Sequence, residues 1–148
     1  MIHIILHGLA HNYGTGELDI YLLDCKGREY EDYTEEPKVD GSVIPSLPHI
    51  RLVTLEANVE YGITVLRHLV EEMDRRKKLF RNFKDYREKE HLPRVLLFID
   101  EFQVLFQADY KEAGEAQRLL NELLRQGRST GTHVCACNTN IDWIGQAD

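Results

Sequence analysis

Two adjacent acids, Asp100 and Glu101, have the clearest capacity for chemistry in this chain of 148 residues. They directly follow the apolar run 95–99. Such a run is too short to span a membrane and suits a strand covered on both faces. The acids then lie at the carboxyl end of the strand, where open α/β sheets bind ligands. This is the Walker B pattern, in which the Asp holds Mg²⁺, usually through water, and the Glu activates the attacking water. A buried strand followed by a solvated turn would give the same pattern.

Polar side chains follow two further apolar segments in the same way. Asp24 and Lys26 come after the short run 18–23, and Asn138 and Thr139 come after the last apolar segment of the chain. In a parallel sheet these strand ends meet at one edge. Asp24 and Lys26 could then face a nucleotide or a pore, or form a plain polar turn. Asn138 and Thr139 could sense a bound phosphate or the attacking water, or simply begin a loop.

Helices and short strands alternate along the rest of the chain. Apolar residues recur every three or four positions in three segments, which predicts helices over residues 2–12, 56–80 and 113–126. Strands are predicted over residues 18–23, 51–54, 95–99 and 133–137. This alternation implies a three-layer α/β fold with a mainly parallel sheet built from right-handed crossovers. The length favours one domain over residues 1–148.

Composition restricts the class of protein further. The chain is 43% hydrophobic and 29% charged, with a net charge of −7, which is typical of a globular domain and gives no basic footprint for nucleic acid. Residues 30–46 are acidic and polar, and we expect them to form an exposed, flexible loop. The three cysteines form no disulfide framework and fit a reducing compartment. Cys135 and Cys137 are interpreted as small core residues on one face of a strand.

Two polar clusters allow a functional and a structural interpretation. His3, His7 and His11 recur every four residues on the first predicted helix. Such a spacing can hold a metal, but without a carboxylate it favours a solvated face. The run 75–78 contains four bases, which could form a DNA patch. Acids precede these bases by four residues, however, which favours a solvent-facing helix.

Five stretches, in this order, resemble the FtsK/SpoIIIE motor ATPases, the RecA-like ring motors that pump double-stranded DNA. The chain is also similar to their relatives in conjugation and type VII secretion. The stretches are residues 21–29 ("DPKxxEL"), 47–49 ("PHL"), 69–76 ("LVxEMxRR"), 95–102 (Walker B with a following Phe) and 124–133 ("ARxGRAAGIH"). The resemblance implies a RecA-like, P-loop NTPase fold.

The resemblance also implies roles for individual residues. Asp100 would hold Mg²⁺ and Glu101 would activate water for ATP hydrolysis. Arg125 or Arg128 would reach the nucleotide of a neighbouring subunit in a hexameric ring, although capping the C-terminus of a helix is their structural alternative. Double-stranded DNA is the implied polymer, with a secreted protein as the alternative.

Three departures from the family pattern limit these roles. No G-x-x-x-x-G-K-[ST] motif occurs in the 148 residues. In the family this loop lies just before a helix like residues 1–12, so we expect the first strand and the C-terminal strands of the fold to be missing. The family's sensor glutamine aligns with Thr139, whose side chain is shorter. We therefore expect no ATP or Mg²⁺ to remain bound to this chain alone.

Two functions remain open at this point. One is a fragment of an ATP-driven ring translocase, and the other is a non-catalytic ATPase-like scaffold, as in degenerate repeats of type VII secretion motors. Loss of the first strand would bare the edge of strand 134–137, so we expect self-association through that edge or its coverage by residues 1–12. No membrane span or signal peptide occurs, which favours a cytoplasmic chain whose parent could be anchored by other segments.

Overall fold

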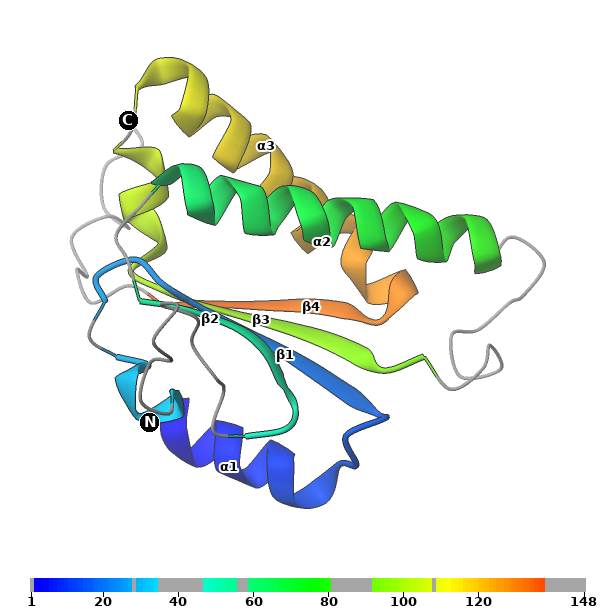
Figure 1. The fold of residues 1–148 in the computed structure, drawn as a ribbon. Coiled ribbons are helices and arrows are strands. Elements are labelled where there is room, and N and C mark those ends of the chain that lie inside the picture. Colours follow the sequence, from blue (N-terminus) through cyan, green and yellow to red (C-terminus); the bar gives the residue numbers. More distant parts are fainter. Residues whose placement is uncertain are drawn as a thin grey trace, which may run out of the picture.

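A parallel sheet of four strands forms the middle layer of the fold (Figure 1). The computed structural model describes residues 2–27, 29–34, 47–55, 59–80, 92–107 and 109–137. The strands are β1 (Leu18–Asp24), β2 (Ile50–Thr54), β3 (Arg94–Asp100) and β4 (Thr132–Cys137). Their order in the sheet is β2-β1-β3-β4, and all neighbouring pairs are parallel. The predicted parallel α/β sheet is confirmed.

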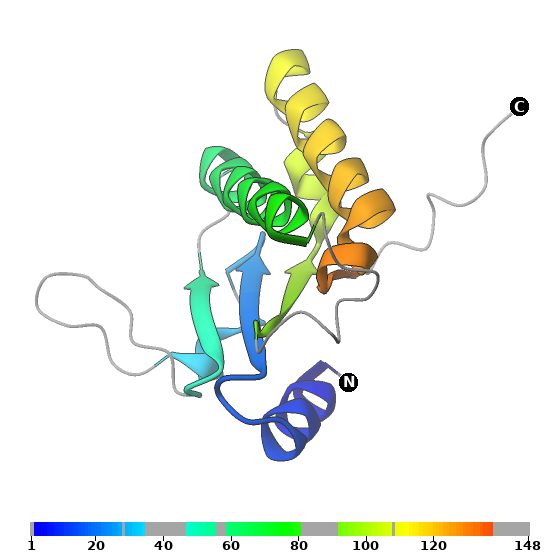
Figure 2. The ribbon, with the colours of Figure 1, turned by 90° about the vertical axis from the view of Figure 1, so that its right-hand side faces the viewer.

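Helices cover both faces of this sheet (Figures 1 and 2). Helix α1 (Ile2–Asn12) packs on one face, and α2 (Val59–Leu79) and α3 (Tyr110–Gln126) pack on the other. Three short 3-10 helices complete the described elements: Glu31–Tyr33, Phe102–Phe106 and Gly127–Thr130. The result is the predicted three-layer arrangement.

Strand β3 explains why its sequence is almost continuously apolar. Leu97 and Ile99 are fully buried against the α2 and α3 side, whereas Phe98 is buried against the α1 side. Successive side chains of a strand point to opposite faces, so a central strand covered on both faces needs apolar residues at every position. This burial holds the end of the strand, and with it Asp100, in a fixed place.

Helix α3 begins earlier than its apolar pattern predicts. The carboxylate of Asp109 accepts hydrogen bonds from the backbone N–H groups of Lys111 (3.1 Å) and Glu112 (3.0 Å). This is an N-cap, which satisfies backbone donors that have no partner within the first turn. The helix therefore starts at Tyr110, although its buried stripe begins only at Ala116.

Two expectations about the α1 side of the sheet are wrong. Ile5 is 42% exposed, because α1 buries Ile2 and Leu6 instead. Tyr30 and Tyr33, which fall in the predicted exposed loop, are 0% and 2% exposed because they pack into the core below α1. The remainder of that loop, residues 35–46, lies outside the described residues.

The first histidine of α1 takes part in this packing rather than lying in solvent. The His3 ring stacks on the Tyr33 ring, and His3 Nδ1 lies 2.9 Å from the Tyr33 hydroxyl. His3 Nε2 lies 3.4 Å from Glu29 Oε1. Within the described residues no three His, Cys, Asp or Glu side chains converge on a metal position, so nothing in this part of the chain supports the metal interpretation of the histidines.

Strand β4 lies at the edge of the described sheet and pairs with β3 alone. Cys135 is exposed and Cys137 is half-buried, so the interpretation of Cys135 as a core residue is wrong. The two thiols do lie on one face, as predicted, because they are close enough for a side-chain hydrogen bond, which contributes to the raised pKa of Cys137. Helix α1 packs on the face of the sheet and does not extend it. No helix in the described part of the chain is long and apolar enough to cross a membrane.

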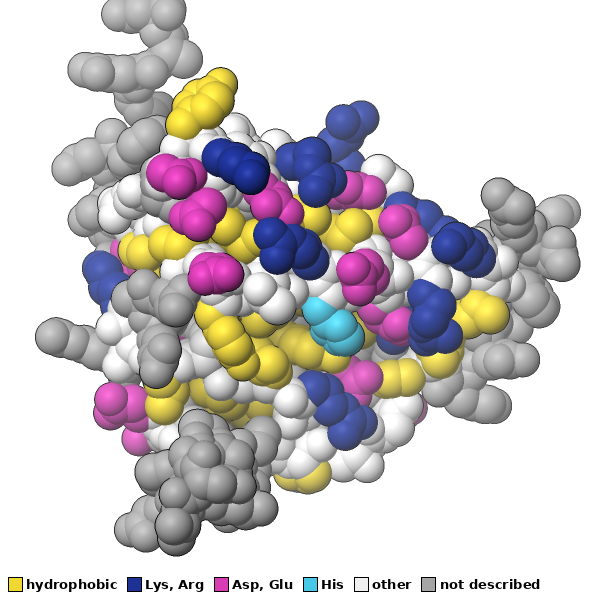
Figure 3. All heavy atoms as spheres, turned by 45° about the horizontal axis from the view of Figure 1, so that its top comes forward, with side chains coloured by type: hydrophobic (Ala, Val, Ile, Leu, Met, Phe, Trp, Pro, Cys, Tyr) yellow, Lys and Arg dark blue, Asp and Glu magenta, His cyan; other side chains and the backbone are white. Residues whose placement is uncertain are grey.

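The outer face of α2 and α3 carries bases and acids side by side (Figure 3). Arg75 forms an ion pair with Glu72, and Lys77 forms one with Asp74. This neutralisation does not favour a DNA patch on the run 75–78. Arg76 departs from the predicted solvent-facing pattern, since it is only 2% exposed.

Glu72 should make the stability of the fold depend on acid pH. A hydrogen bond from Arg75 lowers its pKa most, partial burial opposes this, and Arg76 adds to the lowering, so that the pKa falls from an ordinary 4.5 to about 2. A carboxyl with a lowered folded-state pKa stabilises the protein above about pH 4.5, and this stabilisation is lost as the pH falls towards 2. We expect the loss to be about 3 kcal/mol, at 1.36 kcal/mol per pKa unit.

Urea unfolding from pH 7 to pH 2 would measure this effect against Glu72→Gln, which cannot ionise. The stability difference between wild type and variant should be largest at pH 7 and should shrink below pH 4.5. A difference that is independent of pH would show that the charge of Glu72 contributes nothing.

Candidate functional site

The register of the sheet brings the polar strand ends together. Asp24, at the end of β1, lies opposite Asp100, at the end of β3, and Asp100 lies opposite Cys137 of β4. The backbone N–H of Asp24 donates to Thr54 Oγ1 at 3.0 Å, and the N–H of Cys25 donates to the Asp100 carbonyl at 3.3 Å. All four strands therefore contribute to one edge, as expected for a parallel sheet.

Asp24 organises the turn that follows β1. Its side chain is 0% exposed. Its two carboxylate oxygens accept four backbone N–H groups, from Lys26 (3.0 Å), Gly27 (2.6 Å), Glu29 (2.7 Å) and Tyr30 (3.2 Å). Buried backbone donors must find such partners. Asp24 therefore shapes the turn rather than facing an open pore.

Gly27 is required at the tightest point of this turn. Its φ is +72°, and an added Cβ would lie 2.2 Å from the Leu55 carbonyl oxygen. Only glycine combines this backbone conformation with such a close approach of another chain segment. The turn consequently holds the backbone of Lys26 at a fixed distance from the end of β3.

Glu101 occupies a strained and enclosed position next to Asp100. Its backbone has φ 53° and ψ 47°, a left-handed conformation that non-glycine residues adopt at a cost. Its side chain is 2% exposed, and Oε1 lies 2.8 Å from Lys26 Nζ. Gln103 Nε2 donates a hydrogen bond to the other oxygen, Oε2. Both oxygens of the carboxylate are thus engaged.

Asp100 lies in a negative environment. Its pKa is raised by burial first, and then by the charges of Glu29, Asp24 and Glu101, while Lys26 acts in the opposite direction. Burial and the same acids raise the pKa of Cys25 to about 12. The Cys25 thiol is therefore protonated at neutral pH and is no nucleophile. A bound cation would relieve the repulsion between these carboxylates.

Magnesium fits this edge better than a metal that needs several protein ligands. No set of three metal-binding side chains converges within the described residues. Mg²⁺ is commonly held by one or two carboxylates, with water and phosphate oxygens completing its shell. Asp100 supplies such a carboxylate, and Gln103 Oε1 is a buried acceptor without a partner among the described residues. The edge thus offers oxygen ligands and a negative field.

The structure separates the predicted arginines from this edge. Arg128 lies in the short helix that leads into the start of β4, and Arg125 lies in the last turn of α3. Both are exposed and lie at the end of the sheet opposite to Asp100. They cannot contact the strand edge of their own chain. Asn138 and Thr139 lie outside the described residues.

Glu29 and Gln103 join the site although neither was predicted as a site residue. Glu29 belongs to the turn after β1 and raises the pKa of Asp100. Gln103 lies two residues beyond the acid pair. The only sequence signals were their places in the turn 24–29 and in the segment after the Walker B-like acids.

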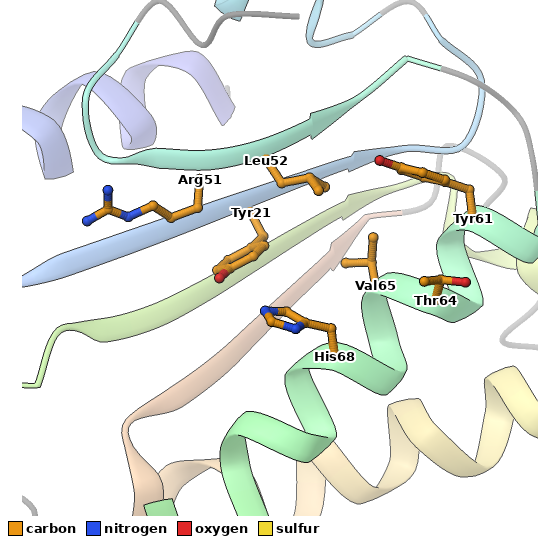
Figure 4. A pocket seen from close by; sticks show the side chains of 7 residues that line it. All are labelled: Tyr21, Arg51, Leu52, Tyr61, Thr64, Val65 and His68. Carbon is orange, nitrogen blue, oxygen red and sulfur yellow. The ribbon is translucent and has the colours of Figure 1, made fainter. Parts of the chain in front are cut away.

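A second hollow lies elsewhere, between β1, β2 and the start of α2 (Figure 4). It has a volume of about 370 Å³. In Figure 4 the rings of Tyr21 and His68 face each other across it, with centroids 6.1 Å apart. It shares no residue with the strand edge. We therefore place the candidate site at Asp100 and Glu101.

Comparison with known proteins places the chain in a family. The model of the FtsK/SpoIIIE family matches residues 1–85, which is more than half of the chain and ends before β3. No curated protein matches.

Solved structures show the same fold at low sequence identity. The pCW3 conjugation coupling protein TcpA, in monomer form with ATPγS, matches with a TM-score of 0.63 and 21% identity over 95% of this chain. ATPases 2 and 3 of EssC from Geobacillus thermodenitrificans match with a TM-score of 0.60 and 19% identity over 90% of this chain. The chain spans 39% and 24% of the lengths of these two structures.

Proposed function

The chain belongs to the FtsK/SpoIIIE family, and we propose that its strand edge is the Walker B part of the ATP site of a ring-forming translocase. The fold is that of P-loop ATPase domains. The observation that carries the proposal is the pair Asp100 and Glu101 at the carboxyl end of β3, beside the turn that Asp24 organises. Open α/β sheets bind their ligands at this edge.

The two acids have different environments and therefore different roles. Asp100 is half-buried among other carboxylates, so it would hold Mg²⁺ through water. The bound Mg²⁺ neutralises charge on the transferred phosphate. Glu101 has the position of the base, one residue beyond the metal-holding acid, and would orient and deprotonate the attacking water.

ATP binding needs more than the residues of this chain. The 148 residues contain no G-x-x-x-x-G-K-[ST] loop, whose backbone N–H groups and lysine cradle the phosphates. The Walker B acids lie on a different strand from that loop in such folds. We therefore propose that ATP and Mg²⁺ are cofactors of a longer protein and that this chain alone retains neither.

The polymer that the motor moves and its assembly complete the proposal. One structural neighbour is a conjugation coupling protein, which favours double-stranded DNA. A secreted protein is the alternative, from the resemblance to type VII secretion motors. Arg125 and Arg128 are exposed at the opposite end of the sheet, where they could serve a neighbouring subunit of a hexameric ring as an arginine finger. The edge of β4 would be a second contact between copies.

Glu101→Gln is the variant that tests the proposed function. The coding sequence upstream of Met1 should supply a P-loop, and the assay uses the chain extended to include it. We expect turnover of ATP to fall about a hundredfold, as for removal of a general base, while ATP binding is retained. Glu115→Gln is the control, because Glu115 pairs with Arg67 on the surface. Unchanged turnover in Glu101→Gln would contradict the proposal and favour the scaffold function.

A further inference from the structure

The resting position of Glu101 is not that of a working base. A general base must offer a free oxygen to the water that it deprotonates. Glu101 is 2% exposed, with Lys26 Nζ on one oxygen and Gln103 Nε2 on the other. The carboxylate must therefore lose one of these partners before it can act.

Lys26 is the partner that can leave without a change of backbone. Its side chain is 51% exposed, whereas its backbone N–H is fixed by the buried Asp24 carboxylate at 3.0 Å. Gln103 lies only two residues from Glu101 and belongs to the same 3-10 segment. A long, exposed lysine side chain can rotate into solvent or towards a phosphate oxygen, which forms strong hydrogen bonds with an ammonium group.

We propose that Lys26 is a positioning residue that holds Glu101 closed in the resting protein, so that Glu101 becomes available only when a phosphate at the strand edge draws the ammonium away. This inference rests on the proposed role of Glu101 in ATP hydrolysis. It gives Lys26 a role towards Glu101 in its own chain, rather than towards a pore.

Chemical labelling of Glu101 in this chain tests the closed state without ATP. A water-soluble carbodiimide activates accessible carboxyl groups, which then form an amide with added glycine ethyl ester. Peptide mass spectrometry gives the rate at each acid, with Glu115 as the internal reference. We expect Glu101 in Lys26→Met to be labelled at least fivefold faster than in wild type, and Lys26→Arg to stay close to wild type because arginine keeps the charge.

Equal labelling of Glu101 in all three proteins would overturn the proposal, and so would an arginine variant that behaves like the methionine variant. A purely structural role for Lys26 would change the melting temperature and leave the ratio of Glu101 to Glu115 labelling unchanged.

A cross-link provides a second measurement that needs no variant to fold. Without added amine, the carbodiimide should join the Lys26 amine to the Glu101 carboxyl, since their atoms lie 2.8 Å apart. The new amide bond forms with net loss of one water, which converts the carbodiimide to a urea. Failure to form this cross-link in wild type would overturn the resting pair. Neither result depends on ATP turnover, so failure of the proposed function would appear separately, as unchanged activity in Glu101→Gln.

Discussion

Asp24→Ala is expected to lower the free energy of unfolding by about 4 kcal/mol, because a buried donor left without its partner costs about 1–3 kcal/mol. The Asp24 carboxylate accepts four backbone N–H groups, of which Gly27 N–H is the closest at 2.6 Å. Water that enters the turn would restore some of these bonds, so the total stays below the sum of four separate losses. The effect should also reach Glu101, since this turn positions Lys26.

Asp24→Asn is the matched control. An amide keeps one oxygen acceptor but turns an NH₂ group towards the other pair of N–H donors. Two of the four bonds should survive, and the loss of stability should be about half that of the alanine variant. Urea unfolding of the three proteins measures the series, and the Lys26–Glu101 cross-link reports the position of the turn. An alanine variant as stable as the asparagine variant would show that the four hydrogen bonds do not hold the turn.

The order of helices and strands could be predicted because burial leaves a direct trace in the sequence. A strand covered on both faces must be apolar throughout, as in residues 95–99, and a helix covered on one face must repeat every three or four residues. Contacts between distant segments leave no such trace. Tyr30 and Tyr33 are polar enough for a loop, yet α1 buries them.

The candidate site could be predicted only in part, for a similar reason. The strand ends that carry Asp24 and Asp100 were placed together by the logic of a parallel sheet. The capture of four N–H groups by Asp24 depends on the course of the following turn, and the ion pair between Lys26 and Glu101 depends on the left-handed backbone of Glu101. A single sequence gives no signal for either geometry.

Arg76→Ala is expected to destabilise the fold by about 3–5 kcal/mol, the usual cost of removing one partner of a buried ion pair. The guanidinium is 2% exposed and binds three groups from different parts of the chain. It donates to Glu72 Oε1 at 2.7 Å, to the Pro93 carbonyl at 2.8 Å and to the Thr130 carbonyl at 3.2 Å. Arg76 thereby ties α2 to the segments that lead into β3 and β4, so its removal leaves two carbonyl groups and a cavity without partners.

Arg75 offers an internal control, because it binds the same glutamate from the surface. Its Nε lies 2.6 Å from Glu72 Oε2, but its side chain is 53% exposed. Exposed ion pairs contribute about 0–1 kcal/mol, so Arg75→Ala should have little effect. Arg76→Lys should fall between the two, since lysine keeps the charge but lacks the planar fork that reaches both carbonyl groups. Equal midpoints of urea unfolding for Arg75→Ala and Arg76→Ala would show that the carbonyl contacts contribute nothing, and that Glu72 alone accounts for the burial of Arg76.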